Sequence, residues 1–384
     1  MKILITGARG FIGKNLIAEL ENIRDGKRNN LPFSFPKTIE IYPYDMDTDF
    51  QCLENYCAKA DFIFHLAGVN RPQKVSEYME GNFGFTSLLL NTLRKYNNRA
   101  PIVLSSSIQA ELDNPYGLSK KAGEELLFSY AREMNSSVLI YRFPNVFGKW
   151  CRPNYNSVVA TFCHNIAHNL PIQINDPEAR LNLVYIDDVV EELIATLVGQ
   201  EHKEGEYCVV PTVHSVLLGD IAEMLHLFKE SRSSLQIPDL SDAFTKKLYS
   251  TYLSYLPTDA FSYPLKMNVD QRGSFTEFLK SGDRGQVSVN ISKPHITKGE
   301  HWHHTKNEKF LVVSGRGVIR FRKIGEEQVY EYFVSGDKLE VVDIPVGYTH
   351  NIENLGDTDM VTIMWVNEVF DPESPDTYFE KIKE

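Results

Sequence analysis

The stretch that decides the fold of the first half is MKILITGARGFIG, residues 1–13. Its apolar run at 3–5 ends just before Gly7, which predicts a buried strand leading through a glycine-rich turn into a helix. The spacing of Gly7, Gly10 and Gly13 lets backbone N–H groups approach a pyrophosphate at the positive end of that helix. A plain glycine-rich turn is the alternative. The position of the loop after the first strand of an alternating β/α pattern favours a dinucleotide site.

The chain shows two different patterns of apolar residues, one after the other. Up to about residue 245 short apolar strands alternate with helical stretches, which is typical of an α/β Rossmann-like, doubly wound parallel sheet. The expected strands are 3–5, 39–45, 62–66, 102–104 and 138–141, and the clearest helices are 117–133 and 187–197. From about residue 285 short strands are separated by glycines, which predicts an all-β sandwich or barrel. These strands are 286–291, 309–313, 317–322, 331–334 and 360–366.

The length of 384 residues exceeds what one hydrophobic core usually supports, so two domains are expected. We predict a dinucleotide-binding domain over 1–247, a connector over 248–264 and a second domain over 265–384. The connector holds four tyrosines and one phenylalanine, interleaved with two prolines. A flexible linker would be poor in aromatic residues, so we expect an ordered segment packed between the domains.

Composition narrows the partners and the compartment. The net charge of -11 disfavours nucleic acid or an anionic membrane, so small molecules are the expected partners. The five cysteines are odd in number and scattered, which argues against a disulfide framework and fits a reducing cytoplasm. The short apolar start predicts a strand rather than a signal peptide, and no apolar run is long enough for a membrane span.

A second motif in the first half suggests proton transfer. Tyr116 and Lys120 would share one face of a helix, and an ammonium beside a phenol favours the phenolate. Such a tyrosine can exchange a proton with a carbonyl or alcohol. The Tyr-x-x-x-Lys pattern alone occurs by chance in many helices. Ser107, at the end of the preceding strand, adds the hydrogen-bond donor that a carbonyl/alcohol couple needs.

With further motifs, the first half resembles the extended short-chain dehydrogenase/reductase family that acts on nucleotide sugars. These motifs are HLAG at 65–68, Asn82 with Thr86, RFPNVFG at 142–148, and Arg180 before VYIDDV at 184–189. The resemblance implies that Ser107, Tyr116 and Lys120 are catalytic and that Asn145 and Arg180 face the nucleotide diphosphate. It implies cofactor contacts at Gly7, Arg9, Gly10, Phe11, Ile12, Gly13, Asp45, Leu66, Ala67, Gly68, Tyr116 and Lys120.

Two details refine that resemblance. Dehydratases of the family have an Asp-Glu pair after the catalytic serine or threonine, whereas Ile108 and Gln109 stand here, so simple reduction or oxidation is favoured. Asp45, near the end of the expected second strand, would bond a ribose 2′-hydroxyl and repel a 2′-phosphate. Arg9 would do the reverse, so these residues leave NAD and NADP open.

The second half carries a metal-site pattern of the cupin type. His301, His303, Glu308 and His350 supply imidazoles and a carboxylate, a set suited to zinc, iron, nickel or manganese. His304, next to His303, would point to the opposite face of a strand. A divalent metal beside a ketone can polarise it and stabilise the enediolate formed when a neighbouring carbon loses its proton. We therefore predict a metal site that could epimerise such a carbon.

The whole chain resembles the CapF-type bifunctional enzymes of bacterial capsular polysaccharide synthesis, most strongly over 283–290 and 301–315. This implies that a cupin (jelly-roll) barrel epimerises C3 of a UDP-2-acetamido-2,6-dideoxy-4-hexulose. The first domain then reduces C4 with NADPH, giving UDP-2-acetamido-2,6-dideoxy-L-talose on the route to UDP-N-acetyl-L-fucosamine. The resemblance also implies zinc and a homodimer. Two alternatives remain: the cupin is a structural dimerisation or ligand-sensing module, or the first domain is a C4 epimerase that works by transient oxidation.

Overall fold

The computed structural model describes residues 1–28, 38–373 and 375–382. The chain divides into two compact units: Met1–Leu225 with Lys246–Pro257, and His226–Thr245 with Thr258–Glu384. The domain boundaries expected after residues 247 and 264 stay predictions, because compactness alone does not mark where a domain ends. Within the described ranges, no helix combines the length and apolar character that crossing a bilayer requires.

The first unit is built on a seven-stranded sheet with the order β2-β1-β3-β4-β5-β9-β8. Its strands are β1 (Lys2–Thr6), β2 (Glu40–Tyr44), β3 (Phe62–His65), β4 (Ile102–Ser107), β5 (Val138–Phe143), β8 (Lys203–Glu204) and β9 (Tyr207–Cys208). Neighbouring strands pair in parallel except β8 with β9. The predicted doubly wound sheet is therefore confirmed. The strand order reverses at β1, since β2 and β3 lie on its two sides, and ligands bind at the carboxyl ends of the strands beside such a reversal.

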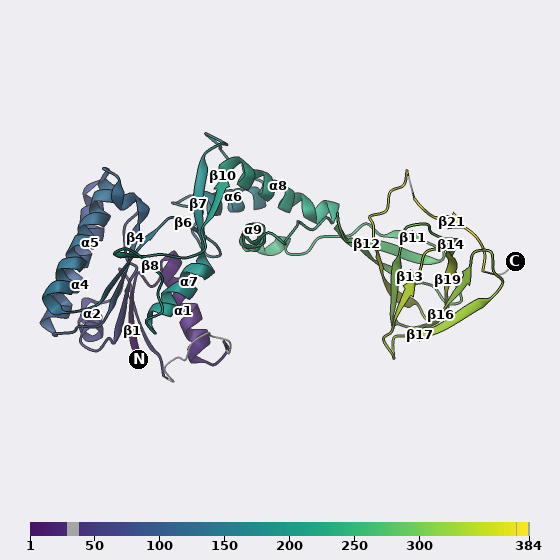
Figure 1. Cartoon of the computed structure of the whole chain (residues 1–384), viewed down its shortest axis with the longest axis horizontal. Helices are drawn as coiled ribbons and strands as arrows, with labels where there is room; N and C mark the ends of the chain where they lie inside the picture. The colour runs from purple at the N-terminus through teal and green to yellow at the C-terminus, as the bar shows by residue number, and fades with distance from the viewer. Residues whose placement is uncertain (29–37, 374, 383–384) are drawn as a thin grey trace. The chain divides into compact units, whose positions relative to one another are not determined.

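Helices cover both faces of this sheet, α2, α4 and α5 on one side and α1 and α7 on the other (Figure 1). The helices are α1 (Phe11–Arg24), α2 (Phe50–Cys57), α3 (Ser76–Tyr78), α4 (Phe85–Lys95), α5 (Pro115–Met134), α6 (Val158–Ala167), α7 (Ile186–Thr196), α8 (Leu218–Ser234) and α9 (Ala243–Leu253). Short helical turns are η1 (Met79–Gly84), η2 (Ile108–Glu111) and η3 (Thr258–Ala260). Alternate side chains of β1 enter different cores: Ile3 and Ile5 pack with α1 and α7, and Leu4 packs with α2, α4 and α5.

A three-stranded sheet, β10-β7-β6, extends the first unit. It contains β6 (Asn145–Phe147), β7 (Arg180–Tyr185) and β10 (His214–Leu217). The sequence did not predict this sheet or α9, because these elements are short or overlap the predicted connector. Tyr252 of α9 is fully buried, and the Tyr255 hydroxyl donates to the carbonyl oxygen of Cys151 at 2.6 Å. This half of the predicted connector thus packs on the first unit.

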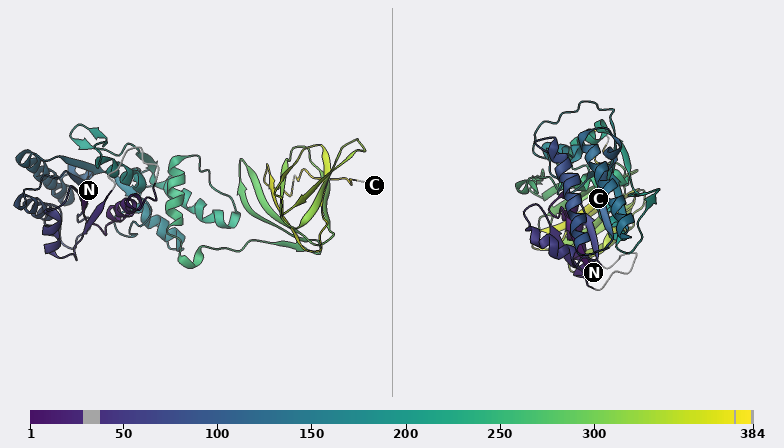
Figure 2. Two further views of the ribbon diagram at one scale, coloured as in Figure 1. Left: turned by 90° about the horizontal axis from the view of Figure 1, so that it is seen from below. Right: turned by 90° about the vertical axis from the view of Figure 1, so that its left-hand side faces the viewer.

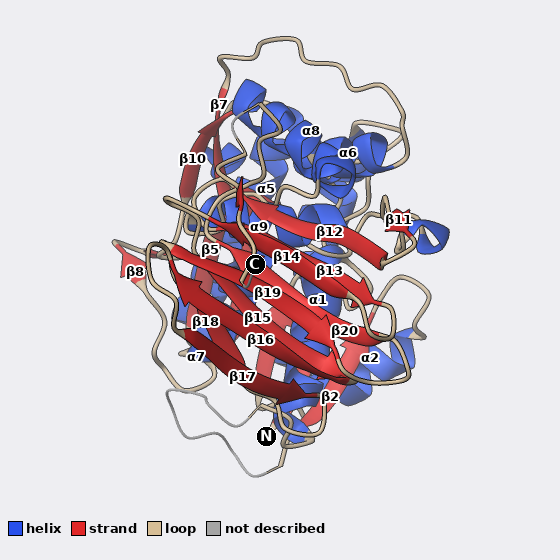
Figure 3. Cartoon of the chain, turned by 90° about the vertical axis from the view of Figure 1, so that its right-hand side faces the viewer, coloured by secondary structure: helices blue, strands red, loops and turns tan. Residues whose placement is uncertain are grey.

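The second unit contains two antiparallel sheets that form a barrel of the cupin type (Figures 2 and 3). One sheet has the order β11-β12-β13-β20-β15-β18, and the other has the order β17-β16-β19-β14-β21. The strands are β11 (Asn268–Asp270), β12 (Gly273–Ser281), β13 (Gly285–Ser292), β14 (Thr297–Trp302), β15 (Glu308–Ser314), β16 (Arg316–Lys323), β17 (Val329–Ser335), β18 (Val341–Ile344), β19 (Tyr348–Asn354), β20 (Met360–Val366) and β21 (Tyr378–Phe379). Side chains from both sheets, among them Phe310, Ile319 and Ile352, make its core. The predicted all-β barrel is confirmed.

Candidate active site and metal centre

The glycine loop after β1 is shaped by contacts that allow no side chain. Gly7 has φ +71°, and a Cβ added there would lie 2.7 Å from the backbone nitrogen of Ala67. A Cβ on Gly13 would lie 2.2 Å from the carbonyl oxygen of Gly7. Gly10 is the N-cap of α1 and cannot cap the helix with a side chain, so the first-turn N–H groups can bind an anionic ligand. The loop therefore fits a pyrophosphate.

A cavity of about 720 Å³ opens at the carboxyl ends of β1, β3, β4 and β5. Of the residues predicted for catalysis and binding, it is lined by Gly7, Arg9, Gly10, Phe11, Ile12, Gly13, Leu66, Gly68, Ser107, Tyr116, Lys120 and Asn145. The fold thus brings the serine, tyrosine and lysine together beside the glycine loop. Ligands bind beside a reversal of strand order in such sheets, so a nicotinamide dinucleotide bound at the loop would reach these side chains.

Three predicted residues, Ala67, Asp45 and Arg180, do not line this cavity. Ala67 lies behind Gly7, and its N–H donates to the Thr6 hydroxyl at 3.4 Å. Arg180 is exposed at the start of β7, and its Nη1 donates to the carbonyl oxygen of Ser215 at 3.4 Å. The structure therefore does not bring Arg180 into the cavity with Asn145.

Lys120 is a buried ammonium in this cavity. It is 8% exposed, and its Nζ donates to the carbonyl oxygen of Ser105 at 3.1 Å. Burial lowers the pKa of Lys120 to about 8. Gly68 makes room for it, because a Cβ there would lie 2.8 Å from Nζ. The lysine is thus close to losing its proton near neutral pH.

The Tyr116 phenol has a raised pKa, because burial disfavours the phenolate more than the hydrogen bond with Ser107 favours it. The expectation that Lys120 lowers this pKa is wrong for this structure. The Lys120 ammonium lies 5.8 Å from the centre of the tyrosine ring and bonds the Ser105 carbonyl instead. A phenol that stays protonated at neutral pH suits the donation of a proton to a carbonyl oxygen.

Asp45 and Arg9 are linked to each other at the end of β2. The Arg9 N–H donates to Oδ2 of Asp45 at 2.7 Å, and Oδ1 accepts from the N–H of Met46 at 2.8 Å. The exposed guanidinium of Arg9 pairs with Asp47, which is also exposed. Exposed ion pairs contribute little, so the guanidinium can exchange this partner for another anion at small cost.

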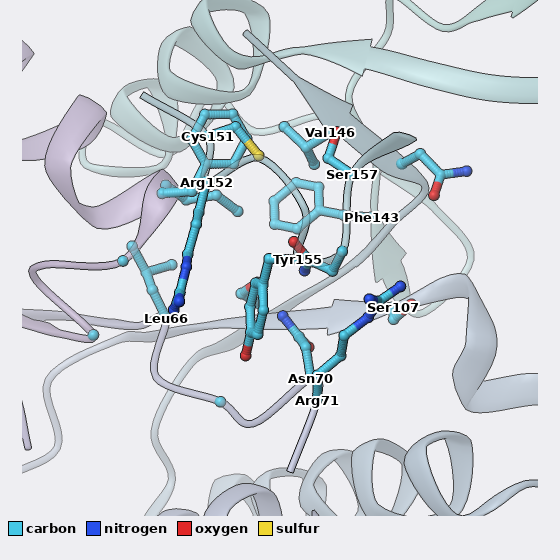
Figure 4. Close-up of a pocket in the computed structure, with 18 of the residues that line it drawn as sticks. Leu66, Asn70, Arg71, Ser107, Phe143, Val146, Cys151, Arg152, Tyr155 and Ser157 are labelled. Carbon is cyan, nitrogen blue, oxygen red and sulfur yellow. The ribbon is translucent and has the colours of Figure 1, made fainter. Parts of the chain in front are cut away.

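The cavity also contains basic and aromatic side chains that the sequence analysis missed. Arg71, Arg152 and Tyr155 extend into it from loops (Figure 4). The Arg152 guanidinium lies 5.3 Å from the centre of the Tyr155 ring. Arg152 and Tyr155 follow the RFPNVFG motif as a basic and an aromatic residue, but nothing in their spacing marks them as facing a ligand.

The second unit brings its four predicted ligands together. One donor atom from each of His301, His303, Glu308 and His350 lies within 4.8 Å of the others. Oε2 of Glu308 is 3.1 Å from Nε2 of His350 and 3.5 Å from Nε2 of His303. These buried donor atoms have no hydrogen-bond partner among the described residues. Burial works against ionisation of Glu308, yet the neighbouring His303 and His350 lower its pKa to about 2. A buried cluster of unpaired imidazoles around a carboxylate fits a divalent metal.

The neighbours of the cluster determine how its ligands are presented. The carbonyl oxygen of Asp376 is 2.6 Å from Nδ1 of His303 and can accept a hydrogen bond from its N–H, which leaves Nε2 for the cluster. The Asp376 carboxylate accepts hydrogen bonds from the N–H groups of His304, Thr305 and Lys306. His304 is exposed in this loop and its ring contacts Trp302, so it points away from the cluster as expected.

Two family models match the chain: the NAD dependent epimerase/dehydratase family over residues 3–209, and the polysaccharide biosynthesis C-terminal domain over residues 268–378. A UDP-2-acetamido-2,6-beta-L-arabino-hexul-4-ose reductase of Pseudomonas aeruginosa is 46% identical over 378 residues, which cover 98% of both chains. The crystal structure of the capsular polysaccharide assembling protein CapF of Staphylococcus aureus matches with a TM-score of 0.91 and 58% identity, over 99% of this chain and 100% of that one. This chain belongs to the CapF family.

Membership in the CapF family confirms the predicted family, and its amino-terminal part places it among the NAD dependent epimerases and dehydratases. A nicotinamide cofactor goes with that membership. A UDP-glucuronic acid 4-epimerase of Bacillus cereus in complex with NAD matches at 21% identity with a TM-score of 0.52, over 66% of this chain and 98% of that one. That match supports the fold alone. The roles of individual site residues in this CapF family member stay predictions.

Proposed function

We propose that this chain is a bifunctional nucleotide-sugar enzyme of capsular polysaccharide synthesis. Its barrel inverts C3 of a UDP-2-acetamido-2,6-dideoxy-4-hexulose, and its first unit then reduces C4 with NADPH to UDP-2-acetamido-2,6-dideoxy-L-talose. The observation that carries the proposal is the presence, on one chain, of two residue clusters whose chemistry suits the two reactions. Ser107, Tyr116 and Lys120 line the first cavity, and a buried His/Glu cluster lies in the barrel. The homodimer and the cytoplasmic location remain predictions from the family resemblance.

In the reductase half, the nicotinamide would supply a hydride to C4 when bound. Tyr116 then donates its phenolic proton to the C4 oxygen, which becomes the hydroxyl. Ser107 hydrogen-bonds the phenol, and with substrate bound its single hydroxyl proton can instead turn to the C4 oxygen and donate there beside Tyr116. The phenolate that remains regains a proton from water, and the Lys120 ammonium, 5.8 Å from the centre of the tyrosine ring, would stabilise it until then through charge alone, without a direct bond.

NADPH is favoured over NADH because Arg9 can move from Asp47 to a 2′-phosphate. Asp45 opposes this choice, but its carboxylate is already engaged by the N–H groups of Arg9 and Met46. The bonds of Asp45 reduce its repulsion of a phosphate without removing it. NAD therefore remains usable in this proposal, at lower efficiency.

In the barrel, His301, His303, Glu308 and His350 would hold a zinc ion or another divalent metal. The metal would polarise the C4 ketone and thereby acidify the proton on C3. Inversion requires that this proton leaves one face of the ring and that another returns to the opposite face. The order of the two reactions follows, because reduction of C4 removes the ketone that makes C3 acidic and so prevents reversal.

The test is NMR of the UDP-4-keto-6-deoxy sugar with the metal-loaded chain in D₂O, first without any nicotinamide. We expect loss of the C3 proton signal, followed by formation of one reduced sugar when NADPH is added. His350→Ala should abolish the exchange and leave the fold intact, while Tyr116→Phe should keep the exchange and abolish NADPH oxidation. An unchanged C3 signal in metal-loaded protein would favour a structural barrel beside a simple reductase. A 4-epimer formed without net NADPH use would favour the C4 epimerase.

A further inference from the structure

A second cavity, of about 620 Å³, lies inside the barrel and contains a lysine that none of the proposed steps uses. Its lining includes the cluster residues His301, Glu308 and His350 together with Lys298 and Arg272. A volume of this size is typical of sites for small molecules of nucleotide or drug size. The cavity therefore has room for more than the ring that reacts at the metal.

A β-bulge in β14 places Lys298 on the same face as His301. Residues three apart on a regular strand point to opposite faces. Here the register shifts between Gly299 and His301, and Glu300 has φ +60°. As a result Lys298 pairs with Ile352 and His301 pairs with His350. Ile352 and His350 are two residues apart on β19, so both of their partners face the interior.

The surroundings of the Lys298 ammonium do not neutralise its charge. Nζ donates to Oδ1 of Asn290 and to the carbonyl oxygen of Ile291, both at 2.8 Å, and both acceptors are neutral. Over residues 1–28, 38–373 and 375–382, no carboxylate forms an ion pair with it. Burial lowers the pKa of Lys298, and Asp270 only partly opposes this. A half-buried cation without a counter-charge destabilises the folded state. Such a group is therefore a candidate for binding a ligand.

With a divalent metal at the cluster, the charges around the cavity would sum to a positive value. Arg272 is already paired with Asp270, Nη2 to Oδ2 at 2.6 Å, so this pair adds no net charge. A divalent metal and Lys298 together outweigh the single carboxylate of Glu308. The cavity thus favours an anionic ligand, and the ammonium lies away from the cluster rather than in it. The β19 register separates the two positions by about 7 Å along the strand, roughly the span of one sugar ring.

We propose that Lys298 binds the diphosphate of the sugar nucleotide in the barrel while C3 and C4 lie at the His/Glu cluster. The proposal rests on the epimerase function above, and it adds a second nucleotide-sugar site to the chain. The lysine acts here as a compact point charge for phosphate oxygens. Its bonds to Asn290 and Ile291 hold it in place before the ligand arrives.

The experiment is the steady-state rate of C3 proton exchange in D₂O with zinc-loaded full-length protein and no nicotinamide. Lys298→Gln should raise KM by about 10- to 100-fold, as expected for loss of a charged hydrogen bond, with kcat within a few-fold of the wild type. Lys298→Arg keeps the charge and should recover most of the affinity. The matched control is Lys293→Gln, because Lys293 is an exposed lysine of the same barrel that pairs with Asp359.

Calorimetric titration with UDP gives a readout that does not depend on exchange. We expect a second UDP site per chain in the wild type and its loss in Lys298→Gln, with zinc content unchanged. Should that variant fail to fold, the wild-type KM for exchange must still rise steeply with NaCl, since salt screens the phosphate contact.

Three results would overturn the proposal: an unchanged KM in Lys298→Gln, a fall in kcat with KM unchanged, or a single UDP site in the wild type. An unchanged KM would mean that Lys298 only stabilises the packing of β14 on β13. A fall in kcat alone would mean that it acts at the reacting carbons. The experiments can refute the epimerase proposal without refuting the anion site. Absence of exchange in a wild type with two UDP sites refutes the epimerase and keeps the anion site.

Discussion

Replacement of Lys120 by methionine should stabilise the first unit at neutral pH although it removes the reductase activity. The pKa of this lysine falls from 10.5 to about 8 on folding. At 1.36 kcal/mol per pKa unit, that fall corresponds to about 3 kcal/mol by which the buried charge destabilises the folded state. Methionine loses the hydrogen bond to the Ser105 carbonyl, which offsets about 1 kcal/mol. The expected net gain at pH 7 is therefore about 2 kcal/mol.

The sign of the stability difference between the variant and the wild type depends on pH. This dependence identifies the buried charge of Lys120 as its cause. Below pH 8 the lysine is protonated in both the folded and the unfolded state, so its burial penalty is fully present. Between pH 8 and 10.5 the folded state releases its proton first, and the wild type regains stability. The advantage of the methionine variant should shrink by more than half by pH 9.5 and reverse at about pH 10.

Urea unfolding followed by circular dichroism at 222 nm measures this difference, since the helices lie mostly in the first unit. Lys121→Met is the matched control, because Lys121 is the exposed neighbour on the same helix and its replacement should change stability by no more than about 0.5 kcal/mol. A methionine variant that is no more stable at pH 7 would refute the reasoning. So would a stability difference that stays the same from pH 7 to pH 9.5.

Three further substitutions test other parts of the two sites. Arg9→Ala removes the cation now paired with Asp47, and we expect kcat/KM for NADPH to fall about 10- to 100-fold while kcat/KM for NADH changes little. Asp376→Ala frees the backbone N–H groups of the ligand loop and loosens the carbonyl that orients His303, so zinc affinity, measured by chelator competition, should fall about 10- to 100-fold. Gly68→Ala places a Cβ 2.8 Å from Nζ of the cavity lysine, and kcat for reduction should fall by at least about 10-fold with KM for the cofactor less affected.

Each of these has a control of the same type. Arg24→Ala removes an exposed arginine of the same unit, and Asp371→Ala removes an exposed aspartate that accepts a hydrogen bond from the N–H of Glu373. Gly84→Ala adds a Cβ that would lie 3.7 Å from the carbonyl oxygen of Met79, an ordinary contact distance. Equal losses in a variant and its control would show that the effect is not specific to the site. An NADPH preference unchanged in Arg9→Ala would show that Arg9 does not select the 2′-phosphate.

Many residues of the two candidate sites could be predicted from their spacing in the sequence. The glycine loop, Tyr116 with Lys120, and the metal ligands His301, His303 and Glu308 were recognisable from the sequence, because each group consists of residues a few positions apart; the fourth ligand, His350, lies on a later strand. The central strands of the first sheet and five strands of the barrel were also visible, since buried strands need consecutive or alternating apolar residues, whereas β6, β7 and β10 were not predicted. Family membership follows from the same motifs taken together.

Other features depend on segments that meet only after folding. Arg71, Arg152 and Tyr155 reach the first cavity from loops whose direction no periodicity determines. Lys298 faces the metal cluster because one bulge at Glu300 breaks the alternation of β14. The raised pKa of Tyr116 likewise comes from burial by many neighbours, which outweighs the single lysine that the spacing suggested. The sequence alone determined which chemical groups the chain offers and the folds that carry them. Tertiary structure decided which of those groups share a cavity and how strongly each is desolvated, because both properties are sums over contacts between distant parts of the chain.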